Sequence, residues 1–582
     1  MKKIISMLFA LTMAFLILPQ ASLPAFAQGE GTGTPTRTTT LDLHDAAALE
    51  ALASEDGVTL SGSVYANPAQ GWSYDASSEP KILTLSGANI QIASASDISY
   101  GIRLPADSKI VLAEDTKTVV TAGEATVGSS FAIFAEGDFT IEGSGALEAT
   151  GGNAAENSYG ISSYGGVLNI LDGQITALGG EADSSYGIFT IGAITISGGS
   201  VNATGGTSNN VGTTGIASEA GGITINGESI ITATGGLAKL SAENQGQGGF
   251  ANSMGIYALG GDVLIDGNAV VNASGGDSEN GSTCGIHLNK GFEDGSGGRL
   301  TITGDTQVTA TGGIIVNMQN TFGGAAFIVG GNAKVEISTG TLAEGENIGV
   351  SMTNGYMMLS DQANVMIHAG DGKYGSFGIF LGIDSESAGA NAGEQDGKLV
   401  VSGGSLEVYS ATARNSRAIV AQSDIEITGG SVLAQSGTAT EEASTGILSR
   451  KAISISAQAD VTAQSGQGIS LSASISADGG IVLDPALVVL SPEGAGLSAN
   501  GMYLSAIAGT DGDYATDVHI AQVSEVTTSE PQPEPEASII PEAEPVSGDV
   551  PTTTGSMLWL IVIVTALLCV GGIVFIFMRR KR

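Results

Sequence analysis

The side chains best suited to hold a ligand are hydroxyl and amide groups that recur with a fixed spacing. They form the pairs Asn202 and Thr204, Thr232 and Thr234, Asn272 and Ser274, and Thr309 and Thr311. Each pair lies in a short segment of alternating apolar and polar residues, which is typical of a β-strand with one buried face. If these segments stack, the polar side chains form rows that could hydrogen-bond an extended polysaccharide. An ordinary solvated strand face and an ice-binding Thr-x-Thr surface are the alternatives.

Acidic residues gathered in predicted loops are the candidates for a cation site. The groups are Asp277 and Glu279, Glu293 and Asp294, Asp384 and Glu386, and Asp511, Asp513 and Asp517. Calcium takes roughly six to eight oxygen ligands, which such loops can offer as carboxylates and carbonyls. None of the groups has the spacing of an EF-hand loop or of the glycine-rich calcium nonapeptide. Calcium is therefore the candidate cofactor, and simple solvation of these acids is the alternative.

Catalysis has little support in the sequence. The four histidines show no common spacing, so neither a zinc site nor a Ser-His-Asp triad is indicated. Cys284 stands beside a Gly-Ile pair and is expected to be a small strand residue. Hydrolysis of a polysaccharide needs a close pair of carboxylates, and a lyase needs a base beside calcium-binding acids. Arg103, Arg299 and Arg417 lie apart from the acidic groups in sequence, so we expect no enzymatic activity.

Aromatic residues precede a recurrent Gly-Ile pair. They are Tyr100, Tyr159, Tyr186 and Phe377. If isoleucine points inward and glycine outward, strict alternation turns the preceding ring inward as well. We therefore expect an interior aromatic stack, with an outer row of rings that stacks on sugars as the alternative.

Residues 58–480 consist of one repeated unit, which must position all these side chains. Residues 187–206 show it best: a Gly-Ile strand, then Ile-Thr-Ile-Ser-Gly-Gly, then Val-Asn-Ala-Thr-Gly-Gly. The second and third strands recur seven or eight residues apart, as in Ile194 and Val201 or Val335 and Leu342. Three short strands in about 28 residues, with loops of variable length, are typical of a parallel β-helix. The fold class predicted is all-β, a solenoid of about 14–16 turns.

Both ends of such a solenoid expose strand edges and need caps. Residues 28–57 are expected to form a linker and a short amphipathic helix. Asp45 is its predicted N-cap, and Leu49 and Leu52 are predicted to face inward. Residues 481–522 depart from the repeat and are the expected C-terminal cap.

The two ends of the chain predict export and anchoring. Residues 1–27 have the basic start, apolar run and small-x-small cleavage site of a secretion signal. Residues 523–556 are acidic and proline-rich, as expected of an extended stalk. Residues 557–578 carry no charge and are long enough to cross about 30 Å of hydrocarbon. The basic tail at 579–582 should then stay cytoplasmic.

The same C-terminal region resembles a Gram-positive cell-wall sorting signal. Pro551, Thr554 and Gly555 match part of the sortase pattern Leu-Pro-x-Thr-Gly. Valine replaces its leucine, and one extra residue separates Pro551 from Thr554. Attachment by sortase and a retained single-pass anchor therefore both stay open, and each places the body at the cell surface.

Charge limits the choice of partner. The chain has 59 acidic and 21 basic residues, and six of the bases lie in segments 1–27 and 579–582. The predicted exported part therefore keeps 15 bases against 59 acids, a net charge of −44. A nucleic-acid partner is excluded because neutralising phosphates requires many basic residues. An acidic polysaccharide would need divalent cations to bridge it to this surface.

Four segments within residues 81–180 carry a family resemblance. They are Leu-Thr-Leu-Ser-Gly-Ala-Asn-Ile at 83–90, Gly-Ile at 101–102, Lys-Ile-Val-Leu-Ala-Glu-Asp-Thr at 109–116 and Asp-Phe-Thr-Ile-Glu-Gly-Ser-Gly-Ala-Leu at 138–147. This part resembles the carbohydrate-binding β-helix family of clostridial cell-surface proteins. The resemblance implies a right-handed parallel β-helix, bound calcium and an acidic plant polysaccharide such as polygalacturonate as ligand.

No ligand residue of that family carries over, because no specific site motif is visible here. Residues and resemblance together lead to three expectations. The first is a non-catalytic, surface-anchored carbohydrate-binding protein. The second is a structural or adhesive surface rod that contacts host or neighbouring cells, and the third is a polysaccharide-degrading enzyme.

Overall fold

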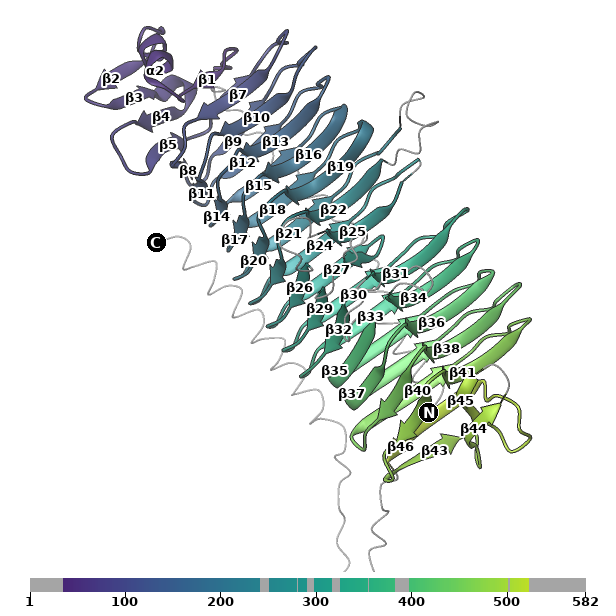
Figure 1. The fold of residues 1–582 in the computed structure, drawn as a ribbon. Coiled ribbons are helices and arrows are strands. Elements are labelled where there is room, and N and C mark those ends of the chain that lie inside the picture. Colours follow the sequence, from purple (N-terminus) through teal and green to yellow (C-terminus); the bar gives the residue numbers. More distant parts are fainter. Residues whose placement is uncertain are drawn as a thin grey trace, which may run out of the picture. The chain divides into compact units, whose positions relative to one another are not determined.

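The computed structural model describes residues 35–240, 251–279, 281–289, 298–316, 325–353, 355–382, 397–500 and 503–522. In this part the chain forms a right-handed β-solenoid of about 12 turns, with almost no helix (Figure 1). The predicted secretion signal, stalk, apolar span and basic tail, with Pro551, Thr554 and Gly555, lie outside the described residues. Among the helices that are described, none combines the length and the apolar character that crossing a membrane requires.

Each coil adds one strand to each of three parallel ladders, which confirms the predicted repeat of three strands. In the coil that follows Gly180, β16 (Ala182–Thr190) belongs to ladder 1, β17 (Ile194–Ile196) to ladder 2 and β18 (Ser200–Thr204) to ladder 3. In the next coil the corresponding strands are β19 (Ser208–Ser218), β20 (Ile223–Ile225) and β21 (Ile230–Thr234), and each pairs in parallel with its predecessor.

The other strands follow the same order. Ladder 1 also contains β1 (Leu41–Asp42), β7 (Ser99–Leu104), β10 (Ser130–Ala135), β13 (Asn157–Ser163), β22 (Asn252–Ala258), β25 (Thr283–Leu288), β28 (Ile314–Val316), β31 (Glu346–Met352), β34 (Gly375–Leu381), β36 (Asn415–Ala421), β38 (Ala443–Ser449) and β41 (Leu471–Ala477). Ladder 2 contains β5 (Lys81–Leu85), β8 (Ser108–Leu112), β11 (Phe139–Glu142), β14 (Leu168–Ile170), β23 (Val263–Ile265), β26 (Arg299–Ile302), β29 (Ala326–Val329), β32 (Tyr356–Leu359), β39 (Ala452–Ile455) and β42 (Gly480–Leu483). Ladder 3 contains β6 (Asn89–Gln91), β9 (Lys117–Thr121), β12 (Ala146–Thr150), β15 (Gln174–Leu178), β24 (Val270–Ser274), β27 (Gln307–Thr311), β30 (Lys334–Ser338), β33 (Asn364–His368) and β40 (Ala459–Gln464). The long strands β35 (Lys398–Tyr409) and β37 (Ile425–Gln435) contribute to ladders 2 and 3 in turn.

The core is a continuous column of aliphatic side chains inside the three ladders. Register places Ile188 beside Ile216, Ile194 beside Ile223, and Val201 beside Ile231, and all six are at most 1% exposed. Burying such a side chain contributes about 1.5–3 kcal/mol relative to leaving it in water. Repetition of these contacts from coil to coil explains why one register persists along the stack.

One predicted strand pair is wrong. Val335 lies in β30 of ladder 3, not in ladder 2, and Leu342 lies outside the strands and is 42% exposed. The ladder 2 strand of this coil is β29, which pairs with β26 and β32. The correct pair, Phe327 and Val335, is eight residues apart, and Val335 and Leu342 are seven apart, so the spacing rule alone could not choose between the two segments.

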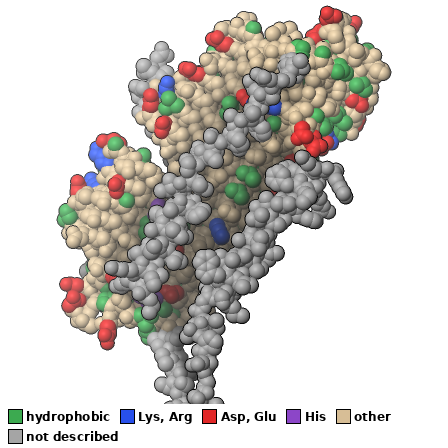
Figure 2. Space-filling model, turned by 180° about the vertical axis from the view of Figure 1, so that it is seen from behind, with side chains coloured by type: hydrophobic (Ala, Val, Ile, Leu, Met, Phe, Trp, Pro, Cys, Tyr) green, Lys and Arg blue, Asp and Glu red, His purple; other side chains and the backbone are tan. Residues whose placement is uncertain are grey.

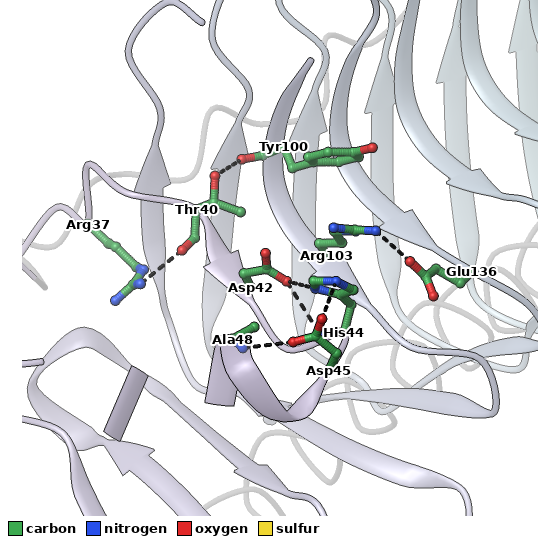
Figure 3. Close-up of polar contacts among 9 residues, drawn as sticks. All are labelled: Arg37, Thr40, Asp42, His44, Asp45, Ala48, Tyr100, Arg103 and Glu136. Carbon is green, nitrogen blue, oxygen red and sulfur yellow. Dashed lines mark hydrogen bonds and ion pairs between the residues drawn. The ribbon is translucent and has the colours of Figure 1, made fainter. Parts of the chain in front are cut away.

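The N-terminal end of the stack combines a helix with antiparallel strands. Helix α2 (Ala46–Ala53) begins after Asp45, whose carboxylate accepts a 2.8 Å hydrogen bond from the Ala48 amide (Figure 3). Leu52 is buried and Leu49 packs against the core, as predicted. Most of this end is nevertheless β-structure. The strands β2 (Thr59–Ser61), β3 (Val64–Asn67) and β4 (Trp72–Asp75) pair antiparallel in sequence and join β5, with the short 3₁₀ turn η1 (Pro68–Gln70) between β3 and β4.

The C-terminal end is also built of antiparallel strands. They are β43 (Leu487–Ser491), β44 (Gly496–Asn500), β45 (Tyr503–Ala508) and β46 (Asp517–Gln522). β46 pairs with β40 and β43, and β45 pairs with β41 and β44. The predicted 14–16 turns are too many because antiparallel pairing replaces coils at both ends, and about 12 turns remain.

Candidate ligand-binding site on the outer face of ladder 1

The polar residues predicted to bind a ligand form two straight rows on ladder 3. Register aligns Asn202, Thr232, Asn272 and Thr309 in one row, and Thr204, Thr234, Ser274 and Thr311 in the other. All eight side chains are at least partly exposed. Leu178 ends the second row on one side, and Glu336 ends the first row on the other. The structure thus brings the predicted residues together, but as a flat surface with no aromatic side chain among them.

The acidic candidates are spread over different loops. Asp277 and Glu279 are exposed after β24. Asp511 accepts a hydrogen bond from the Asp513 amide at 3.1 Å, and Asp517 accepts one from the Gln464 side chain at 3.2 Å. Glu293, Asp294, Asp384 and Glu386 lie outside the described residues. Within the described ranges no group of three His, Cys, Asp or Glu side chains could hold a metal ion, and calcium held partly by carbonyls stays a prediction.

The rings that precede the Gly-Ile pair lie outside the solenoid, so the predicted interior aromatic stack is wrong. In β16, Gly187 and Ile188 are both buried, whereas Tyr186 and Phe189 are partly exposed. A Cβ on Gly187 would lie 2.6 Å from the Thr204 amide nitrogen of ladder 3, so only glycine permits this close approach. Two consecutive inward residues break the alternation and turn the preceding ring outward.

The outward rings form a stacked row along ladder 1. Tyr100, Phe131, Tyr159 and Tyr186 follow one another at centroid distances of 5.3, 4.7 and 5.3 Å, with planes inclined by 15°, 10° and 9°. These distances are close to the spacing of neighbouring strands, so the rings face one another along the solenoid axis. Phe189, three residues after Tyr186, packs at 4.9 Å against it and at 5.3 Å against Tyr159.

The first ring of this row is held by a charged pair. The Arg103 guanidinium lies 5.3 Å from the centre of the Tyr100 ring and forms a 2.6 Å ion pair with Glu136 of the next coil (Figure 3). A cation over an aromatic face is attracted by the ring quadrupole. The sequence neighbourhood of Arg103 indicated that it is isolated from acids, but the structure places Glu136 beside it. The charge of Arg103 is therefore already paired.

A pocket of about 270 Å³ opens where the row of rings stops. One coil further on, Thr214 is in register with Tyr186, and Ala217 is in register with Phe189. In the coil after that, Tyr257 is in register with Ala217. Aromatic walls come from Tyr159, Tyr186, Phe189 and Tyr257, and polar groups from Asn157 and Glu219. Small-molecule sites have typical volumes of about 300–1,000 Å³, with apolar walls and a few polar groups. The volume of this pocket is close to the lower end of that range, so the pocket is the size of a single ring.

The tyrosines of the pocket are hydrogen-bond donors at neutral pH. Burial raises the pKa of Tyr257 to about 12 and also raises the pKa of Tyr159 and of Tyr186. The Glu219 carboxylate adds to the increase in all three phenol pKa values, which places it near their hydroxyl groups. The pocket thus combines phenol donors, an amide and one carboxylate.

A buried cluster closes the far side of Tyr257. The Tyr257 ring contacts His287 at 5.3 Å, and His287 Nδ1 lies 3.2 Å from the Met254 sulfur. Burial lowers the pKa of His287 to about 4, so the imidazole is neutral at physiological pH. Cys284 is buried in β25, and burial raises its pKa to about 12. An un-ionised, buried thiol is unreactive, which fits a packing role.

A second depression, of about 520 Å³, is a weaker candidate. It lies at the turns between ladders 2 and 3 and is lined by small polar residues around Asp361 and Ser402. The Asp361 carboxylate already accepts 2.9 Å hydrogen bonds from the Gly331 amide and the Ser360 hydroxyl. No aromatic or basic side chain is among its lining residues, so it offers a ligand few contacts.

Asn157, Phe189, Glu219 and Tyr257 were not predicted as site residues. A signal for the two rings is present in the sequence. Aromatic residues recur three positions apart around a Gly-Ile or Ala-Ile pair, as in Phe131 and Phe134, Tyr186 and Phe189, and Phe377 and Phe380. In strict alternation, residues three positions apart face opposite sides of a strand. Two rings on the same side at this spacing therefore mean that the alternation is broken between them. Nothing in the sequence indicated Asn157 or Glu219, which reach the pocket from the strand start and the following turn.

Comparisons of the chain with protein-family models, with curated proteins and with solved structures found no match. A function must therefore be argued from the geometry and chemistry of the site.

Proposed function

We propose that the chain is a non-catalytic, cell-surface carbohydrate-binding protein whose ligand enters the ladder 1 pocket. The observation that carries the proposal is a ring-sized pocket with aromatic walls and hydrogen-bonding groups at Asn157, Glu219 and Tyr257. The C–H faces of a sugar pack on aromatic rings, while its hydroxyl groups need donors and acceptors at the edge. Aromatic walls supply contact area, and the phenols also supply directed hydrogen bonds.

The composition of the pocket supports binding rather than hydrolysis. Glu219 is the one carboxylate among the lining residues, and glycoside hydrolysis generally uses two. No basic side chain lines the pocket, so the base of a lyase is also missing from the lining set.

Three further parts of the proposal come from the sequence. Export and anchoring, through either sortase or a retained span, would display the solenoid at the cell surface. The polar rows on ladder 3 would contact a longer polysaccharide by hydrogen bonds. Calcium would bridge an acidic polysaccharide such as polygalacturonate to a surface with a net charge of −44.

A glycan-binding screen of the full-length chain, with and without calcium, tests the proposal. We expect at least one glycan to be retained, and Tyr257→Ala to weaken its binding about tenfold or more, because a central aromatic contact is lost. Tyr164→Ala is the matched control, because Tyr164 is 62% exposed and is not among the pocket residues. Retention of no glycan, or full binding by Tyr257→Ala, would overturn the proposal.

An adhesive surface rod is the second candidate. The continuous parallel stack with exposed polar rows on ladder 3 favours it, since such a surface can contact other macromolecules without a pocket. Attachment to cells that persists after enzymatic removal of their glycans would favour this function over the first.

A further inference from the structure

Beside the row of rings on ladder 1 runs a second column of outward residues, in which a small residue, Ala217, stands between two rings. Rings one coil apart in the row stack at 4.7–5.3 Å. In the neighbouring column of outward residues, Phe189, Ala217 and Tyr257 occupy three successive coils in register. The strands that carry Phe189 and Tyr257 are therefore separated by two strand spacings, about 9–10 Å. Ala217 occupies one level of this column with a methyl group that is only 1% exposed, so it forms the floor of the pocket between the two rings.

We propose that this pocket is a slot for a single pyranose ring and that it selects an uncharged, gluco-configured sugar over a uronic acid. The inference rests on the proposed carbohydrate-binding function and names the class of ligand for the same pocket. The acidic polysaccharide that the family resemblance implies would then bind to a different surface of the solenoid.

The walls of the slot favour a sugar with two apolar faces. In a pyranose whose hydroxyl groups are all equatorial, axial C–H groups cover both faces of the ring. Aromatic faces carry the negative part of the ring quadrupole and attract such C–H groups. Phe189 and Tyr257 lie one coil before and one coil after Ala217, and both line the pocket, with the Phe189 ring inclined by 52° to that of Tyr186. Each side of the sugar would therefore meet an aromatic side chain. An axial hydroxyl, as in a galacto-configured sugar, would turn a polar group toward one wall.

The edge of the slot favours a neutral ligand. Glu219 and Asn157 are in reach of the equatorial hydroxyl groups, and the raised pKa of Tyr257 keeps its phenol protonated. Glu219 would repel the carboxylate of a uronic acid, and no lining residue is basic. The arginines on this face of ladder 1, Arg103 and Arg417, lie in β7 and β36, several coils away from β16. Like charges brought together in a binding site cost several kcal/mol.

The test uses calorimetric titration of the full-length chain with three probes: cellobiose, β-1,4-galactobiose and a galacturonate disaccharide, each with and without a calcium chelator. We expect cellobiose to bind at least tenfold more tightly than the other two, with no effect of the chelator. Ala217→Phe should reduce cellobiose binding at least tenfold, because a protein ring then fills the slot.

Ser351→Phe is the matched control, because Ser351 is an outward residue of ladder 1 whose register neighbour is Phe380 of the next coil. It adds a ring elsewhere on ladder 1 and should leave binding unchanged. Glu219→Gln gives an independent reading even if Ala217→Phe folds poorly, and it should reduce the preference for cellobiose over galacturonate at least tenfold.

The outcomes separate the two proposals. Tighter binding of galacturonate that is lost with the chelator and unaffected by Ala217→Phe would overturn the slot while the carbohydrate-binding function stands. An unchanged preference in Glu219→Gln would overturn the role of charge in the selection. If none of the three probes binds but the glycan screen finds another ligand, the slot is overturned alone, and if the screen is empty, both proposals fail.

Discussion

A small residue at position 187 allows two consecutive residues to face inward, so the aromatic ring before it lies outside. Gly187 approaches ladder 3 so closely that a Cβ there would meet the Thr204 nitrogen at 2.6 Å. The chain then continues inward with Ile188, which leaves Tyr186 on the outer face. In β10 the corresponding residue is Ala132, which is buried beside Ile133 and leaves Phe131 outward as well. Glycine or alanine at this position therefore goes with a ring in the outer row.

His287, which packs against Tyr257, makes the stability of the fold depend on pH. Burial lowers its folded-state pKa to about 4, below the usual value of about 6.5, so on acidification the unfolded chain binds a proton before the folded chain does. The neutral form stabilises the fold above pH 6.5, and this contribution is lost as the pH falls toward 4. Between pH 7 and pH 4.5, the loss should reach about 2–3 kcal/mol at one site. Urea unfolding of the wild type and of His287→Phe at the two pH values measures it.

His287→Phe should lose less stability on acidification than the wild type, because phenylalanine has no proton to bind. His368→Phe is the control, since His368 is exposed on ladder 3, where its ring stacks on Tyr409. It should follow the wild type, and equal acid sensitivity in all three proteins would contradict the assignment. Comparing variants removes the effect of the many surface carboxylates, which is common to them.

At the scale of elements, a chain of buried hydroxyl groups ties neighbouring coils together. Ser185 Oγ donates to the Gly180 carbonyl at 2.7 Å and accepts from the Gly206 amide at 2.7 Å. Ser158 makes the same two contacts one coil earlier, to Gly152 and Gly180. Each hydroxyl satisfies backbone groups of two successive coils at the corner between ladders 3 and 1, where the strands themselves do not pair.

Ser185→Ala should destabilise the solenoid by about 1–2 kcal/mol, because it removes the hydrogen bonds of the hydroxyl to the partly buried Gly180 carbonyl and Gly206 amide. The midpoint of thermal or urea unfolding measures the loss. Ser200→Ala is the matched control, since Ser200 belongs to the same coil but lies at the partly exposed start of β18. Equal midpoints for the two variants would show that the buried hydroxyl chain adds no stability.

The strands and their order could be predicted because period-two alternation and glycine pairs are local signals. Ile194 and Val201 needed only their neighbours to be placed inside. Tyr186 could not be placed by the same rule, because Gly187 and Ile188 both face inward, and Gly187 does so in close contact with Thr204, 17 residues later. The pocket escaped prediction for a similar reason: it depends on Ala217 standing in register between Phe189 and Tyr257, and the length of the intervening loops hides that register.

At the scale of the whole molecule, ion pairs connect side chains of neighbouring coils. Lysines pair with glutamates one coil further on, as in Lys109 with Glu142 at 3.1 Å and Lys117 with Glu148 at 2.7 Å. Exposed pairs of this kind contribute about 0–1 kcal/mol each. Most of the face seen in Figure 2 is uncharged, with acidic side chains in separate small groups. On this face the acidic side chains are therefore dispersed and do not gather in one cluster.

The C-terminal strands close the stack, and this closure leads to a prediction about association. β46 covers the edge of β40 by antiparallel pairing, with Val518 and Ile520 fully buried. The double substitution Val518→Asp and Ile520→Asp buries two charges, which should detach β46 and expose a strand edge that can pair with another copy. Sedimentation velocity should then reveal concentration-dependent oligomers that the wild type does not form. Substituting the outward residues of the same strand, Asp517→Asn with His519→Gln, should leave the sedimentation profile unchanged, because these side chains do not face the core and their replacements keep polar groups beside Gln464 and Asp460 of β40. A doubly charged variant that sediments and melts like the wild type would mean that β46 does not protect the end of the solenoid.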